Sequence, residues 1–173
     1  MDGLVNPIDW LCKNSKEFQS LSEDERNAIT DFTLLWSFFE ANEFDSHASS
    51  RHIYAHVHEW QSKGMLNVAS FAKSFGYFQN RYFNNSIASE YYMGLYLREN
   101  DKPELVEAVL KGENTNPADC IAALLIVIYR LRNNLFHGIK WNNAIHDQLD
   151  NFSHANTVLM VAMESLAKFR VSQ

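Results

Sequence analysis

Apolar residues recur at every third or fourth position along much of the chain, which is the spacing of one helical face. The clearest pattern predicts a helix from about Glu23 to Asn42, and Ser22 with Glu25 forms a capping box before it. Similar patterns and end signals predict further helices over residues 50–63, 68–82, 86–100, 103–110, 117–137 and 144–169. Six glycines and three prolines are few among 173 residues. We therefore predict an all-α helical bundle with a single domain over residues 1–173.

One predicted helix is apolar on every side instead of along one stripe. It has Asn116 as its N-cap and Pro117 as its first residue, and it runs through "IAALLIVI" to His137, where Gly138 supplies the C-cap. A helix of this kind lies at the centre of a bundle or in an interface between subunits. Its last two turns differ, because two arginines, two asparagines and a histidine interrupt the apolar run in "YRLRNNLFHG".

Composition narrows the class of protein. The formal net charge of −6 argues against a protein that coats nucleic acid non-specifically, so any contact with nucleic acid has to be local. The longest apolar run, "CIAALLIVIY", is about half the length that spans a bilayer. The two cysteines belong to no metal-binding or redox motif, and "MDGLVNPIDW" lacks a signal-peptide pattern. We expect a cytoplasmic protein with no membrane segment and no cofactor.

The polar end of the apolar helix brings together groups that suit RNA cleavage. At about 100° per residue, Asn133 and His137 share one face and Arg132 borders it. Arg132 carries a planar guanidinium that suits a phosphodiester, and Asn133 can orient the phosphate or the imidazole. In metal-free cleavage the ribose 2′-hydroxyl attacks its own phosphate, His137 moves protons and Arg132 holds the transition-state charge. The candidate catalytic residues are therefore Arg132, Asn133 and His137.

The string "YRLRNNLFHGIK" resembles the motif of the HEPN superfamily of ribonucleases, with an arginine, four residues and a histidine near the end of an apolar helix. It is most similar to the ApeA-like HEPN proteins of bacterial antiphage defence. "FTLLWSFFEA" is similar to the first long helix of that group. The resemblance covers these two helices and the all-α plan, with no match over residues 44–100. It implies a HEPN-like homodimer in which two copies of the motif meet at a two-fold interface.

The resemblance further implies an endoribonuclease that leaves 2′,3′-cyclic phosphate and 5′-hydroxyl ends. RNA would be the substrate, the role would be antiphage defence or that of a toxin, and an antitoxin or a defence partner is possible. Glu40 is implied as an auxiliary acidic residue that orients Arg132 or His137, and Lys140 either guides RNA or is a solvated lysine. Some HEPN proteins are not catalytic, so a module for dimerisation or for binding a partner or a nucleotide is the alternative.

Simpler interpretations stay open for several of these residues. Arg132 and His137 can both cap the last carbonyl groups of their helix. Arg130 faces away from Arg132 and is expected at the surface or in a dimer contact. Three residues on one helical face have a spacing that suits zinc, and they are His52, His56 and Glu59. The alternative is a polar face beside the path of an RNA strand. Most aromatic residues between 71 and 96 are expected in the core, with one or two free to stack on RNA bases.

Overall fold

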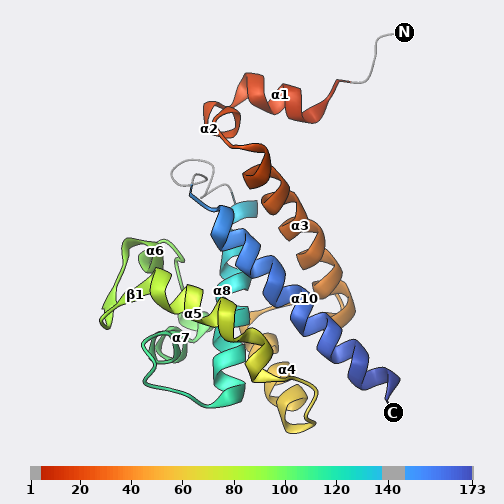
Figure 1. Ribbon diagram of the computed structural model, residues 1–173, viewed down its shortest axis with the longest axis vertical. Coiled ribbons are helices and arrows are strands. Elements are labelled where there is room, and N and C mark those ends of the chain that lie inside the picture. The colour runs from red at the N-terminus through yellow and green to blue at the C-terminus, as the bar shows by residue number, and fades with distance from the viewer. Residues whose placement is uncertain (1–4, 138–146, 173) are drawn as a thin grey trace.

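The computed structural model describes residues 5–137 and 147–172 (Figure 1). Within these residues helices predominate, and the only sheet has two short antiparallel strands, so the predicted all-α fold is confirmed. The α-helices are α1 (Pro7–Asn14), α2 (Lys16–Gln19), α3 (Glu23–Phe44), α4 (Ser50–Ser62), α5 (Ala72–Tyr82), α6 (Glu90–Met93), α7 (Pro103–Leu110), α8 (Pro117–Phe136) and α10 (Leu149–Val171). The remaining elements are the 3-10 helices η1 (Val68–Phe71) and η2 (Glu99–Asp101) and the strands β1 (Phe83–Asn84) and β2 (Ile87–Ala88).

Side-chain caps fix where the two long helices of the candidate site begin. Before α3, the Ser22 hydroxyl accepts a hydrogen bond from the Glu25 N–H at 3.2 Å, and the Ser22 N–H donates to the Glu25 carboxylate at 2.9 Å. Before α8, the Asn116 side chain accepts from the N–H groups of Ala118 and Asp119. Both caps satisfy donors that a helix leaves free at its start. The predicted starts of α3 and α8 are confirmed.

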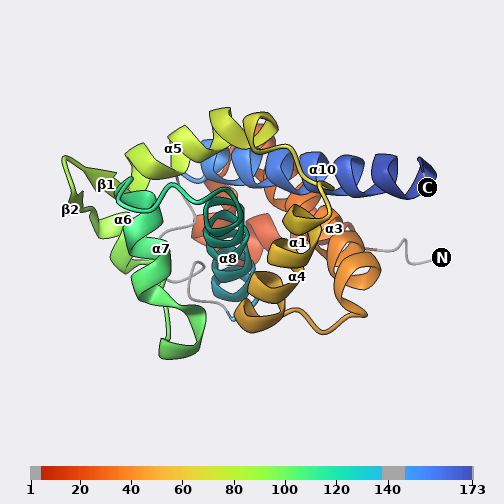
Figure 2. The same ribbon diagram turned by 90° about the horizontal axis from the view of Figure 1, so that it is seen from below.

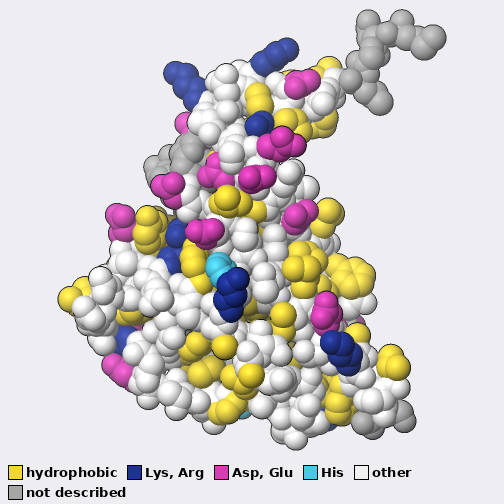
Figure 3. Space-filling model, in the orientation of Figure 1, with side chains coloured by type: hydrophobic (Ala, Val, Ile, Leu, Met, Phe, Trp, Pro, Cys, Tyr) yellow, Lys and Arg dark blue, Asp and Glu magenta, His cyan; other side chains and the backbone are white. Residues whose placement is uncertain are grey.

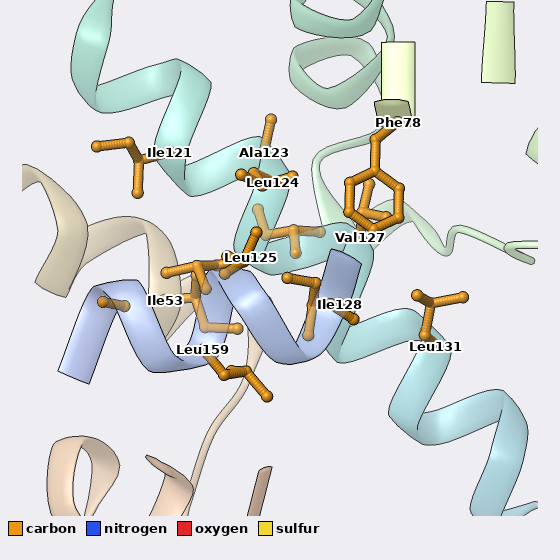
Figure 4. Close-up of a cluster of buried hydrophobic side chains, with 14 of the residues drawn as sticks. Ile53, Phe78, Ile121, Ala123, Leu124, Leu125, Val127, Ile128, Leu131 and Leu159 are labelled. Carbon is orange, nitrogen blue, oxygen red and sulfur yellow. The ribbon is translucent and has the colours of Figure 1, made fainter. Parts of the chain in front are cut away.

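Helix α8 lies at the centre of the bundle. Figure 2 looks along α8 and shows α7 on one side, α4 on the other, and α5 with α10 above it. Every residue from Ile121 to Ile128 is at most 1% exposed. Figure 4 shows these side chains among Ile53 of α4, Phe78 of α5 and Leu159 of α10. The chain's own helices therefore cover the apolar run, which does not need a second subunit to bury it.

Helices α3 and α10 run side by side and form the longest helix pair of the fold (Figure 1). Their contact includes the rings of Phe32 and Phe152, whose centroids are 5.0 Å apart. Near the start of this pair, Asp24 and Asp31 of α3 and Asp150 of α10 line a shared hollow. Figure 3 shows acidic side chains gathered over this part of the molecule. Much of the net negative charge thus lies over α3 and α10.

The prediction of a continuous helix over residues 86–100 is wrong. Strands β1 and β2 form a hairpin there, in which Phe83 pairs with Ala88. Its turn residues, Asn85 and Ser86, have φ of 48° and 63°, the left-handed geometry that a tight hairpin turn requires. Only one helical turn, α6, follows before the chain passes through Leu95 to η2. The apolar residues of this segment mimic a helical pattern, but the turn prevents a continuous helix.

The last long helix begins later than predicted. We predicted a helix from about Ala144, and residues 144–146 lie outside the described part of the chain. Asp147 has a φ of 56°, which interrupts any helix, and α10 begins two residues later, at Leu149. Near the other end of this connection, α8 ends at Phe136 with His137 as its C-cap residue. The predicted C-cap Gly138 lies outside the described residues.

Candidate functional site

Helix α3 supplies the acidic residue that faces the end of α8. The Glu40 carboxylate lies 3.6 Å from a terminal guanidinium nitrogen of Arg132. It also accepts hydrogen bonds from the Trp36 indole N–H at 2.9 Å and from the Ala48 N–H at 3.1 Å. Three donors therefore fix the carboxylate in place. Its position beside Arg132 follows from the packing of α3 against the last turns of α8.

The Arg132 guanidinium is held on several sides but is not enclosed. One terminal nitrogen donates to the Asn133 side-chain oxygen at 3.0 Å, and the guanidinium carbon lies 5.1 Å from the centre of the Phe136 ring. The Nε atom is buried, and it has no hydrogen-bond partner among the described residues. The side chain as a whole is 31% exposed. Because a guanidinium has five N–H donors, Arg132 keeps donors for a ligand such as a phosphate.

His137 ends α8 with its side chain exposed. Its backbone N–H donates to the Asn133 carbonyl at 3.0 Å, which closes the last helical turn. Within the described residues, its imidazole makes no hydrogen bond or ion pair. The Arg132 side chain meets a carboxylate, an amide and a ring instead of the helix-end carbonyl groups. Capping by side chains therefore does not account for either residue within the described part of the chain.

Asn133 connects Arg132 to a polar groove. Its side chain is 7% exposed and lines a groove of about 630 Å³. The groove lies between the start of α4, η2 and the last turns of α8, and its lining residues are Ser49, Ser50, Arg51, Arg98, Glu99, Asn100, Asp101, Lys102, Tyr129, Arg130 and Asn133. We call it the polar groove. One candidate catalytic residue, Asn133, thus forms part of the groove, and Arg132 is hydrogen-bonded to this residue.

The expectation that Arg130 is a surface charge is wrong. Its side chain is only 3% exposed, and its guanidinium pairs with Asp101 of η2 at 3.4 Å. It also donates to the Leu95 carbonyl at 3.2 Å and to the Asn134 side-chain oxygen. Burial lowers the pKa of the guanidinium, and the Asp101 carboxylate opposes that shift. Arg130 therefore fastens η2 to α8, a role that the sequence could not indicate because its partner Asp101 is distant in the chain.

The zinc alternative at the start of α4 is not supported by the arrangement of its residues. The His52 and His56 rings hydrogen-bond to the backbone carbonyls of His47 and Glu43, and His56 also stacks on Phe44. Glu59 points to Lys63, 2.5 Å away. Across residues 5–137 and 147–172, no three His, Cys, Asp or Glu side chains are placed to share a metal ion. His56 instead fastens α4 to the end of α3, and His52 fastens it to the loop that follows α3.

Most aromatic residues of the middle segment lie in the core, as predicted. Phe71, Phe78 and Tyr82 are buried, whereas Tyr91 and Tyr96 are 41% and 54% exposed. The ring of Tyr91 is covered on one side by the Arg81 guanidinium, 4.1 Å from its centre. Lys140, the other auxiliary candidate, lies outside the described residues.

The comparisons give this chain no relative. No protein-family model matches it, and neither a curated protein nor a solved structure is similar enough to count as a match. Among the described helices, none is long and apolar enough to cross a membrane.

Proposed function

We propose that this chain is a metal-independent endoribonuclease of the HEPN type that acts in the cytoplasm. The observation that carries the proposal is that the end of α8 holds two groups with the required chemistry. One is the Arg132 guanidinium, which Glu40 and Asn133 hold in place, and the other is the unengaged His137 imidazole. A fixed cation and a free proton-transfer group are what intramolecular cleavage of RNA requires. The motif resemblance supports a role in antiphage defence or as a toxin.

In the proposed reaction, the ribose 2′-oxygen attacks the adjacent phosphorus and the 5′-oxygen of the next nucleotide leaves. The 2′-hydroxyl loses its proton and the leaving oxygen gains one, and His137 serves one or both transfers. Arg132 binds the phosphate oxygens, where negative charge builds up in the transition state. Asn133 and Glu40 are positioning residues that hold the guanidinium. The products are a 2′,3′-cyclic phosphate and a 5′-hydroxyl end.

We also propose that the active form is a homodimer in which the two motifs face each other. The support comes from Phe136, which is 54% exposed although it lies between Arg132 and His137. Leu34 and Phe38 on α3 are exposed as well, at 66% and 62%. Large apolar side chains that stay in water are typical of a surface that a partner covers. A second copy of the chain would place two Arg132 and two His137 side chains around one RNA strand.

The competing function is a non-catalytic module that dimerises or binds a partner or a nucleotide. The Glu40 carboxylate favours this alternative, because it offsets the charge of the Arg132 guanidinium at 3.6 Å. A neutralised arginine binds phosphate less strongly than a free one. The two functions differ in one outcome, since only the ribonuclease breaks the RNA chain.

The test is to incubate the purified chain with labelled single-stranded RNA in EDTA and to analyse the ends of the products. We expect cleavage that EDTA does not prevent, with cyclic phosphate ends, because the attacking group is the substrate's own hydroxyl. An RNA with 2′-O-methyl groups is the matched control and should stay intact. Cleavage that requires added magnesium or manganese, or products with 5′-phosphate ends, would contradict the mechanism. Intact RNA under all conditions would favour the non-catalytic module.

A further inference from the structure

The polar groove concentrates positive charge in a chain whose net charge is −6. Four cationic side chains line it, and they are Arg51, Arg98, Lys102 and Arg130. Only two acidic residues, Glu99 and Asp101, oppose them in the lining. The excess is local, since acidic side chains gather over α3 and α10 instead (Figure 3). The excess of positive charge in the lining favours anionic ligands in this groove.

Buried polar contacts hold the walls of the polar groove together. The Asp101 side chain is 7% exposed, and its carboxylate pairs with Arg130 at 3.4 Å. It also accepts a hydrogen bond from the Ser50 hydroxyl at 2.5 Å and another from the Arg98 N–H at 2.9 Å. One carboxylate thus ties η2 to both α4 and α8. Because Asp101 is engaged inside the wall, the cations of the groove are balanced mainly by Glu99.

Helix α4 directs its positive end into the polar groove. Its N-cap, Ser49, accepts a hydrogen bond from the His52 N–H, and Ser50 and Arg51 form its first turn in the lining of the groove. The first N–H groups of a helix and its macrodipole both favour anions at this end. The Arg51 side chain is exposed, and it makes no hydrogen bond or ion pair with the described residues. Arg51 is therefore free to bind an anion that enters the groove.

The polar groove is continuous with the candidate catalytic residues. Asn133 lines the groove and accepts a hydrogen bond from Arg132. Ala48, directly before Ser49, donates its N–H to Glu40, the carboxylate that faces Arg132. An RNA strand whose phosphate lies at Arg132 can therefore place a neighbouring phosphate in the groove. Tyr129 also lines the groove, and its ring packs against Trp36 of α3 with the centroids 5.9 Å apart.

We propose that the polar groove binds the backbone phosphates of single-stranded RNA next to the bond that is cleaved. The choice of RNA as the ligand rests on the proposed ribonuclease function, whereas the placement of an anion rests on the groove itself. Arg51, Arg98 and the first turn of α4 contact phosphate, and Arg130 with Asp101 holds the wall behind them. The groove thus determines how a strand enters the site.

The test uses the full chain and a labelled 2′-O-methyl RNA, which has no attacking hydroxyl and stays intact. Affinity is measured over a range of salt concentrations for the wild type and for Arg51→Glu. The control is Lys73→Glu, because Lys73 is the second residue of α5 just as Arg51 is the second residue of α4. In Figure 2, α5 lies above α8 and the beginning of α4 lies below it. Both variants change the net charge equally and place an acid in a first helical turn, where it is tolerated.

We expect Arg51→Glu to weaken RNA binding about tenfold and to reduce the slope of log affinity against log salt by about 0.7 for each lost phosphate contact. Lys73→Glu should bind like the wild type. Equal weakening in both variants would mean that only net charge matters, and it would overturn the proposal. The proposal would also be overturned if a free nucleotide displaced the RNA at an equal concentration of phosphate groups. That result would indicate a site for a small molecule.

Cleavage of unmodified RNA separates this proposal from the ribonuclease itself. If the wild type cleaves RNA but Arg51→Glu keeps wild-type affinity and KM, the groove proposal is wrong and the ribonuclease stands. If the wild type never cleaves RNA but Arg51→Glu still loses affinity with a smaller salt slope, the groove binds RNA and the ribonuclease proposal is wrong. The two proposals can thus fail independently.

Discussion

Three neighbouring side chains orient the side chain of Arg132. Glu40 approaches from α3, Asn133 lies next to it in the chain, and the Phe136 ring lies under the guanidinium. A planar guanidinium can satisfy these contacts and still offer donors to a phosphate, whereas the compact ammonium of a lysine cannot. The geometry around this residue therefore requires an arginine and not simply a positive charge.

At this scale we predict different results for changes at Arg132 and His137. His137→Ala should lower the cleavage rate by about 10² to 10⁴, and His137→Gln should not restore it, since glutamine does not transfer protons. Arg132→Ala should cause a severe loss of cleavage rate and Arg132→Lys a partial loss, because lysine keeps the positive charge but lacks the planar set of donors. Cleavage rates and melting temperatures are measured on the same preparations.

The matched control is Lys168→Ala, which removes an exposed cation near the end of α10. It should change neither the cleavage rate nor the melting temperature. Full activity in His137→Ala and Arg132→Ala would refute the catalytic assignment. A large decrease in the melting temperature of both alanine variants would show instead that the two residues stabilise the end of α8.

The sequence could separate Arg132 from Arg130 only in part. Both arginines lie in one short polar string, and their spacing shows that they face different ways. It does not show which one is buried, because burial of Arg130 depends on Asp101, a partner from a distant segment. By contrast, the relation of Asn133 to His137 depends only on helical spacing. Local relations within α8 were predictable, and those that needed η2 were not.

At the scale of elements, strong local signals gave correct helices and weak ones did not. The capping box before α3 and the proline starts of α7 and α8 were sufficient to place these helices. The segment of β1, β2 and α6 has apolar residues in a helix-like pattern, but its turn at Asn85 and Ser86 decides its structure. The polar groove was missed for the same reason, since one of its walls is η2, at the end of that segment.

The contact between α5 and α10 should make stability depend on pH. The His154 ring stacks on Tyr77 at 4.2 Å and lies 3.1 Å from the Ser74 hydroxyl. Burial lowers the pKa of His154, Asp150 opposes this shift, and Lys73 adds to it. The unfolded chain therefore takes up the proton more readily than the folded chain does. Stability is complete above the usual histidine pKa of about 6.5 and falls as the pH drops below it.

We predict that the urea concentration at the midpoint of unfolding decreases for the wild type as the pH is lowered from about 7.5 to about 5.5. Carboxylates stay ionised over this range. His154→Gln has no titrating group at this position, so its midpoint should fall less. The measurement is urea unfolding at several pH values for both proteins. Identical pH dependence in the two proteins would show that other groups cause the effect.

At the scale of the whole molecule, the question is how two copies meet. We predict a homodimer at micromolar concentration, because Phe136 is exposed beside Arg132 and because Leu34 and Phe38 are exposed on α3. Phe136→Asp should shift the protein toward the monomer and lower cleavage, since a buried unpaired carboxylate is unfavourable in an interface. Val171→Asp, at the exposed end of α10, is the control and should stay dimeric.

Molar mass from light scattering and sedimentation velocity would decide the oligomeric state. A strict monomer that still cleaves RNA would contradict the two-fold site. A dimer that Phe136→Asp leaves intact would place the interface elsewhere on the molecule.

The central position of α8 also has a consequence for synthesis of the chain. Helices α4, α5 and α7 leave the ribosome first, and their apolar side chains, such as Ile53, Phe78 and Val106, have no α8 to cover them. A nascent chain that ends before Pro117 therefore exposes these faces and is a natural client of chaperones. Helix α8, whose end carries Arg132 and His137, covers these faces, and α10 then adds Phe152 and Leu159 to the core. A nascent chain that ends after His137 therefore already carries both residues but lacks α10, so its core is still incomplete.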